Sequence, residues 1–181
     1  MGWLCGYGVF ESIRDYADQE IKCGENFELL DRSVYGKEVY SLFHNKITGV
    51  RFIALHLITH EGNEWCRKDM DESCGPCYYN CPERILVQSN VTDKLAVEWR
   101  ETCRRLRREK KQKTELVKAL KAGDIIEYKG NNLKFIDYHN KSKSQIICFD
   151  IAEGCSYRYR VSEFGMDDLK PKSQNNNTDA A

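Results

Sequence analysis

The sequence of 181 residues predicts an α+β protein, in which an N-terminal antiparallel sheet with helices is followed by a small SH3-like β-barrel. Alternating apolar residues indicate short strands in two separate regions of the chain. Between these regions Leu95, Trp99, Cys103 and Leu106 recur at helical spacing, which predicts an amphipathic helix. Apolar residues make up 41% of the chain, enough to build a buried core.

The first half of the chain is expected to hold a short helix, a sheet and two further helices. The first helix is predicted over residues 12–21, because Ser12 is a good N-cap. Three β-rich segments follow, FELLDRSVY, EVYSLFHN and VRFIALHLITH, with a turn at 46–49. Pro82 suits the first turn of a short helix, PERILVQ, and a longer basic helix should begin near Thr92.

The second half is expected to form the barrel. Its strands are GDIIEY, NNLKFIDYHN, SQIICFDI and CSYRYRVSEF, which polar turns separate. We therefore predict an α+β domain over residues 1–113, a linker over 114–122, a small β-barrel over 123–169 and a disordered tail over 170–181.

Charge is unevenly distributed, although 28 basic and 28 acidic residues balance formally. Residues 91–122 hold 11 basic and 5 acidic side chains, enough for salt-dependent contacts with several phosphates or with an acidic protein. The alternative is a solvated helix that leads into a linker. The residues expected to bind DNA or a protein partner are Arg100, Arg104, Arg105, Arg107, Arg108, Lys110 and Lys111.

A cysteine-rich segment, CRKDMDESCGPCYYNC, spans residues 66–81. The spacing of Cys74, Cys77 and Cys81 can place two or three thiolates on one zinc ion, with Cys66 or Cys103 completing the tetrahedron. The alternative is that Cys77, Cys81 and Cys103 are small buried residues that pack the two helices against the sheet. In both cases we expect this segment to hold the sheet and the basic helix together. No other cofactor is indicated.

Catalytic patterns are weak, so the sequence favours a protein that is not an enzyme. Asp69, Asp71 and Glu72 could bind a divalent ion, as in a metal-dependent nuclease, but further acids or a lysine that such a site needs are not evident. These acids are more typical of a solvated or helix-capping cluster. His56 and His60 share one strand face without a serine nucleophile, and phosphate-loop and dinucleotide motifs are absent.

No apolar segment is long enough to cross a membrane, and the first twenty residues lack the basic start of a signal peptide. The expected location is the cytoplasm, including the cytoplasm of an infected host. Thiols there rarely persist as disulfides, which is why the nine cysteines are interpreted as buried or metal-bound.

Several motifs together resemble an uncharacterised family of small proteins of phages, prophages and conjugative elements. They are MGWL, KDMDE, GPC, CPERIL, EWRETCRRL and LKAGD, in this order along the chain. Against the family pattern, Cys66 and Cys74 are additions. The resemblance therefore weakens a zinc scheme built on Cys74 and leaves one that uses Cys77, Cys81 and Cys103 with an unidentified fourth ligand. The family has no assigned chemistry.

Small accessory proteins of mobile elements often act against host defences, and this chain is similar in size and charge to anti-CRISPR inhibitors of the RNA-guided, Cas-nine type DNA nuclease. The resemblance therefore implies a non-enzymatic anti-defence phage protein that inhibits a bacterial nuclease by binding the nuclease, DNA or both. Two alternatives remain open: a zinc-stabilised nucleic-acid-binding module of a mobile element, and a metal-dependent nuclease.

Overall fold

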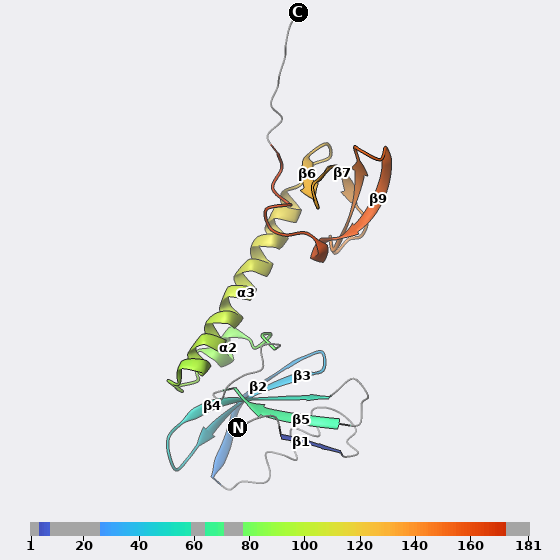
Figure 1. Cartoon of the computed structure of the whole chain (residues 1–181). Helices are drawn as coiled ribbons and strands as arrows, with labels where there is room; N and C mark the ends of the chain where they lie inside the picture. The colour runs from blue at the N-terminus through green and yellow to red at the C-terminus, as the bar shows by residue number, and fades with distance from the viewer. Residues whose placement is uncertain (1–3, 8–25, 59–63, 71–77, 173–181) are drawn as a thin grey trace, which may run out of the picture. The chain divides into compact units, whose positions relative to one another are not determined.

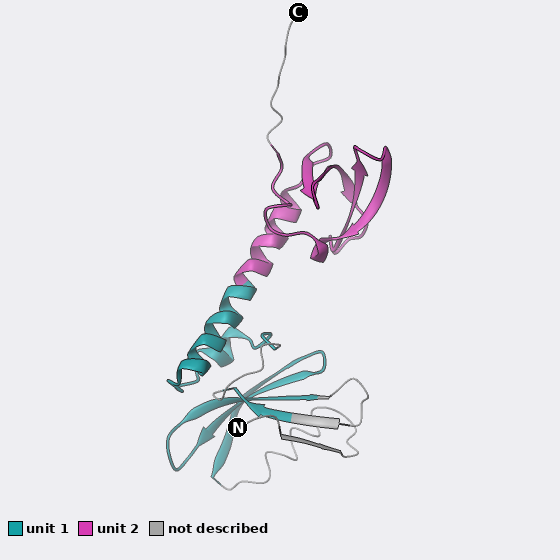
Figure 2. Cartoon of the chain, viewed as in Figure 1, with its two compact units in different colours: residues 1–107 teal, residues 108–181 magenta. Residues whose placement is uncertain are grey.

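The computed structural model describes residues 4–7, 26–58, 64–70 and 78–172. It has the predicted mixed α+β composition and divides into two compact units, residues 1–107 and residues 108–181 (Figure 2). Each unit has its own antiparallel sheet and its own buried core.

The sheet of unit 1 has five strands in the order β1-β5-β4-β3-β2, all antiparallel. The strands are β1 (Leu4–Tyr7), β2 (Phe27–Tyr35), β3 (Glu38–Asn45), β4 (Arg51–Ile58) and β5 (Glu64–Asp69). The three β-rich segments are confirmed as β2, β3 and β4. The cysteine-rich segment begins within β5, which was not expected to be a strand.

Two helices pack on one face of this sheet, α2 (Glu83–Leu86) and the first turns of α3 (Lys94–Ala119) (Figure 1). Their contacts with the sheet are apolar, and the buried Trp99 also donates its indole N–H to the carbonyl of Tyr78 at 2.9 Å. The packed residues are Tyr40, Leu42, Ile53, Leu55, Leu57 and Met70 of the sheet side with Cys81, Ile85, Leu86, Trp99 and Cys103.

The opposite face of β3 and β4 is buried as well. Phe43, Phe52 and Ala54 form a small apolar cluster there, against which Val91 packs. Because both faces of β4 are covered, its sequence is a nearly continuous apolar run and does not alternate between apolar and polar residues.

Both predicted helices of this region are confirmed. Pro82 stands at the N-cap position of α2, where an extended backbone and a missing N–H cost little. Just before α3, the carboxylate of Asp93 accepts a hydrogen bond from the N–H of Leu95 at 2.8 Å. Asp93 thereby caps the helix.

Unit 2 has a four-stranded antiparallel sheet in the order β6-β7-β8-β9, as the pattern of its sequence predicts. The strands are β6 (Ile125–Tyr128), β7 (Asn131–Tyr138), β8 (Gln145–Asp150) and β9 (Cys155–Arg160), and a 3-10 turn, η1 (Val161–Glu163), follows. Gly130 and Gly154 take positive φ in the tight turns between strands, which glycine tolerates best. The closed barrel remains a prediction.

The last turns of α3 belong to unit 2, although residues 114–122 are predicted to be a linker. Residues up to Ala119 are helical, and Val117 and Leu120 are buried against the inner face of the second sheet. The unit boundary falls between Arg107 and Arg108. Most of the predicted disordered tail, residues 173–181, and the predicted helix over 12–21 lie outside the described residues.

Within the described residues, neither helix is long and apolar enough to cross a membrane.

Candidate partner and nucleic-acid interface

The seven basic residues expected to bind a partner fall into two groups, those that pack within unit 1 and those that are exposed. Arg100 is part of the packing of unit 1. Its guanidinium donates to the hydroxyl of Ser89 at 3.0 Å and to the carbonyl of Val91 at 2.6 Å. Partial burial lowers its pKa from the ordinary arginine value. Arg100 therefore fastens the segment before α3 to the helix.

Arg104 and Arg107 are fastened to α2. Both donate to the carboxylate of Glu83, Arg104 to Oε1 and Arg107 to Oε2, each at 2.9 Å. Arg104 also bonds Glu101 at 2.6 Å, and Arg107 bonds the carbonyl of Cys81. The hydrogen bond to Glu83 raises the pKa of Arg104. These two guanidinium groups hold α3 on α2, so their charge is already compensated within the protein.

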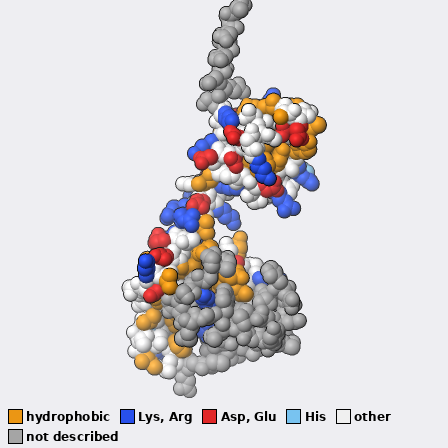
Figure 3. Space-filling view, in the orientation of Figure 1, with side chains coloured by type: hydrophobic (Ala, Val, Ile, Leu, Met, Phe, Trp, Pro, Cys, Tyr) orange, Lys and Arg blue, Asp and Glu red, His pale blue; other side chains and the backbone are white. Residues whose placement is uncertain are grey.

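The other cations of the helix are exposed. Arg105 lies in unit 1, whereas Arg108, Lys110 and Lys111 lie in unit 2. Of these, Arg108 and Lys111 make no hydrogen bond or ion pair with any residue that the structure describes. Figure 3 shows lysine and arginine side chains on the visible surface of unit 2, interspersed with carboxylates.

Arg108 and Lys111 border an open hollow of about 700 Å³ on unit 2, which their helix forms with the segment after η1. Successive turns of one helix face supply one wall. The lining residues are Arg108, Lys111, Gln112, Glu115, Leu116 and Ala119 of α3 and Met166, Asp167 and Lys170. Two of the carboxylates have local partners, since Glu115 pairs with Lys118 at 3.0 Å and Asp167 with Lys170 at 2.6 Å.

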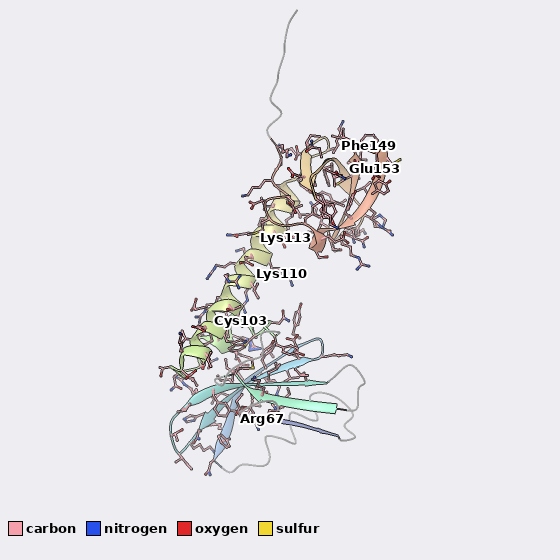
Figure 4. The ribbon with its side chains drawn as sticks, in the orientation of Figure 1. Arg67, Cys103, Lys110, Lys113, Phe149 and Glu153 are labelled. Atoms are coloured by element: carbon pink, nitrogen blue, oxygen red, sulfur yellow. The ribbon has the colours of Figure 1, made fainter. Side chains whose placement is uncertain are left out.

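Lys113 points the other way round the helix and is structural. Its ammonium group donates to the carbonyls of Phe164 and Ser162 and so holds the end of unit 2 on α3 (Figure 4). The basic stretch of the sequence is therefore a mixture of packing residues and exposed ones.

The cysteine corner is described only in part. Cys81 and Cys103 are both buried, close enough for a charge on Cys103 to affect Cys81, and Cys77 lies outside the described residues. Burial, followed by the neighbouring Cys103, raises the pKa of the Cys81 thiol. Two adjacent sulfurs fit half of a tetrahedral zinc site. Within the described ranges no three Cys, His, Asp or Glu side chains gather as metal ligands.

The segment just before Cys81 joins the sheet to α3. The backbone N–H of Asn80 donates to the hydroxyl of Tyr40 at 3.1 Å, and that hydroxyl donates to Glu38 at 2.6 Å. On the helix side, Trp99 bonds Tyr78, as above. These contacts give the corner the structural role that the sequence predicts for it.

The acidic cluster is also described only at its first member. The carboxylate of Asp69, in β5, accepts from Nε and from a terminal nitrogen of Arg67 at 3.2 and 3.1 Å. Asp71 and Glu72 lie outside the described residues. Asp69 is thus partly neutralised by an arginine, which is unlike a carboxylate kept ready for a divalent ion.

His56 sits inside unit 1, where burial together with the positive charges of Arg67 and Arg32 lowers its pKa to about 3. The imidazole is therefore neutral at physiological pH. His44 lies near Glu28 at 3.6 Å, and His60 lies outside the described residues.

Unit 2 carries further cations that are not among the seven predicted contact residues. Arg158 and Arg160 alternate along β9, and Lys134 lies on β7. A guanidinium nitrogen of Arg158 lies 2.9 Å from Nε2 of His139. The signal was present in the sequence as the alternation of CSYRYR, in which the tyrosines share one face and the arginines the other.

The tyrosines of that alternation face inward. Tyr159 packs against Tyr128 and Phe164 with ring centroids 5.4 and 5.8 Å apart, and Tyr138 donates to the carbonyl of Val117 at 2.7 Å. Tyr128, Tyr138 and Tyr159 thus pack against the buried core of unit 2. Tyr157 is the exception, at 43% exposed, and its hydroxyl donates to Glu153.

Comparison with known proteins identifies no relative: no family model, curated protein or solved structure matches this chain.

Proposed function

We propose that this protein is a non-enzymatic inhibitor of a bacterial defence nuclease, and that it acts by binding the nuclease, its DNA or both. The RNA-guided type is the nuclease class that the resemblance of its sequence implies. The proposal places the protein in the cytoplasm of a bacterial host, as an anti-defence factor of a phage or another mobile element.

The observation that carries the proposal is the state of Arg108 and Lys111. They are exposed and have no partner among the described residues, and they border a hollow whose lining includes Leu116, Ala119 and Met166. Cations beside apolar side chains fit an acidic protein surface, and cations alone fit DNA phosphates. The tethered Arg100, Arg104 and Arg107 support the fold and contribute less to contact.

The proposal includes an SH3-like barrel for unit 2. After η1 the chain returns to β6: the N–H of Glu127 donates to the carbonyl of Asp168 at 3.3 Å, and the N–H of Lys172 donates to the carbonyl of Ile125 at 2.8 Å. A fifth segment against the first strand would cover that edge of the sheet, as small barrels do. It would also fix Met166 and Lys170 beside α3, where the hollow lies.

Capture of the nuclease tests the proposal directly. The full chain, immobilised on beads, should retain a purified RNA-guided nuclease loaded with its guide, or should shift a DNA duplex in a gel. Raised salt should weaken either complex, because the contacts are ionic. Retention of neither nuclease nor duplex, even at low salt, would contradict the proposal.

The adjacent thiols of Cys81 and Cys103 favour a second candidate, the zinc-stabilised nucleic-acid-binding module. A zinc ion there would hold the start of α2 on α3, and binding would require both thiols to lose their protons. This candidate predicts one zinc per chain in elemental analysis of the purified full chain, lost in Cys81→Ala. Metal-free protein that is folded and thermally stable would exclude it and leave Cys81 and Cys103 as packing residues.

A further inference from the structure

The outer face of the unit 2 sheet combines an aromatic ring with cations. Strand alternation separates the two faces: Leu133, Phe135, Ile146 and Cys148 are buried on the inner face, with Val117 of α3 and Leu120 just after it. The intervening residues lie on the outer face, away from that core. The outer positions of β7, β8 and β9 are Lys134, Ile147, Phe149, Ser156, Arg158 and Arg160.

Phe149 lies on this face near the end of β8, close to the β8–β9 turn. Cross-strand pairing places it between Lys134 of β7 and Ser156 of β9. It is half-buried and belongs to no core cluster, and no ring contact joins it to another aromatic in the described part of the chain. Figure 4 labels it on unit 2, near Glu153 at the β8–β9 turn. The outer face of the sheet therefore presents one aromatic ring that stays partly exposed.

Cations lie beside the ring and further along the strands. Lys134 is its direct neighbour, and Arg158 pairs with Ile147, two residues away along both strands. Arg160 follows at the end of β9 opposite Gln145. The β7–β8 hairpin adds Lys141 and Lys143 at the same end of the sheet.

The acids near this face make local contacts, and Asp137 shares a cross-strand row with Ile147 and Arg158. Asp137 accepts a hydrogen bond from the N–H of Tyr138 at 2.7 Å, and Glu127 pairs with Lys172 at 2.6 Å. Unit 2 as a whole contains 14 basic and 11 acidic residues, a formal charge of +3. The surface thus favours a polyanion.

We propose that the outer face of the unit 2 sheet binds single-stranded nucleic acid, with a base stacked on Phe149 and phosphates contacted by Lys134, Arg158 and Arg160. Proteins commonly bind single strands with aromatic rings that lie between cations, because every base offers a flat face for stacking and every phosphate carries a negative charge. Duplex bases are already stacked on each other, so a duplex can use only the cations. The site is separate from Arg108 and Lys111 in its residues and its chemistry, and it does not depend on nuclease inhibition.

Titration of the full chain with a fluorescein-labelled oligothymidine of about fifteen nucleotides tests this, since such a strand covers one small β-domain. The labelled strand should bind more tightly than the duplex of equal length. Phe149→Ala should weaken strand binding by roughly five-fold to a hundred-fold, the usual range for losing one stacked base, with little change for the duplex. Phe149→Trp should restore it.

Two further variants separate stacking from folding. Ile151→Ala removes an apolar side chain that is 50% exposed just after β8, and it should leave strand affinity unchanged. Phe149→Leu keeps apolar cover on the sheet without an aromatic face, and it should bind as weakly as Phe149→Ala while keeping the wild-type melting temperature. Arg158→Ala should reduce the salt dependence of strand binding by about one ion.

Three results would overturn the proposal: no strand binding by the wild type, equal binding by Phe149→Leu and the wild type, or loss of nuclease capture rather than of strand binding in Phe149→Leu. The last would identify this face as a protein-binding surface. A variant lacking Arg108 and Lys111 should keep full affinity for the strand. A failure of the inhibitor proposal can therefore be distinguished from a failure of the strand-binding proposal.

Discussion

The ionisable side chains of this protein are of two kinds: those that its own fold buries or pairs, and those that stay exposed and available to a partner. His56 and Arg104 illustrate the first kind. His56 is fully buried and is kept neutral by its surroundings, and Arg104 is held between two carboxylates. Arg108 and Lys111, in contrast, remain exposed. The basic run of the sequence does not show which of its arginines are paired, because the partner of Arg104 is Glu83, which is distant in sequence.

The pKa of His56 makes the stability of unit 1 depend on pH. Its folded pKa of about 3 lies below the unfolded value of 6.5. The unfolded chain therefore binds more protons between these values, and the free energy of unfolding falls as pH falls below 6.5. The loss approaches roughly 1.4 kcal/mol per pH unit, or about 2 kcal/mol by pH 5.

Urea unfolding at about pH 7 and about pH 5 measures this loss. In His56→Gln the difference between the two pH values should shrink by roughly that amount, whatever the variant's own stability. His44→Gln, which alters a half-exposed imidazole, should keep the wild-type difference. An unchanged pH dependence in His56→Gln would show that the buried imidazole does not control it.

Secondary-structure elements follow from the sequence more closely than the site does. The strands β2 to β4 and β6 to β9 and the helices α2 and α3 were predictable, since alternation, turn residues and helical spacing are local signals. β5 was missed because the residues EWCRKD show no apolar alternation. Their pairing with β4 and β1 is a tertiary effect.

The helix α3 shows why the site was harder to predict than the fold. One amphipathic stretch was expected to end a domain and then become a linker, yet it extends to Ala119 and carries core residues for both units. Its arginines at 100, 104 and 107 look like contact residues in the sequence. Only the positions of Glu83, Ser89 and the backbone around them show that they are packing residues.

At the scale of the whole molecule, charge separates between the two units. Residues 1–107 contain 14 basic and 17 acidic residues, a formal charge of −3, whereas residues 108–181 carry +3. A formal net charge of zero therefore conceals a basic unit suited to polyanions or acidic proteins. We therefore assign partner contact to Arg108 and Lys111 of unit 2, and a structural role to Arg100, Arg104 and Arg107 of unit 1.

The most direct test of that assignment is an assay of plasmid cleavage by an RNA-guided nuclease. The concentration of protein that gives half-inhibition is measured for two double variants, together with their melting temperatures. Arg108→Ala with Lys111→Ala should raise the half-inhibitory concentration at least about ten-fold, or roughly 1.4 kcal/mol, with an unchanged melting temperature. Arg104→Gln with Arg107→Gln should lower the free energy of unfolding by roughly 1–2 kcal/mol, because Glu83 loses both partners, yet inhibit normally while folded. The reverse pattern, inhibition lost with Arg104 and Arg107 and kept without Arg108 and Lys111, would contradict the account.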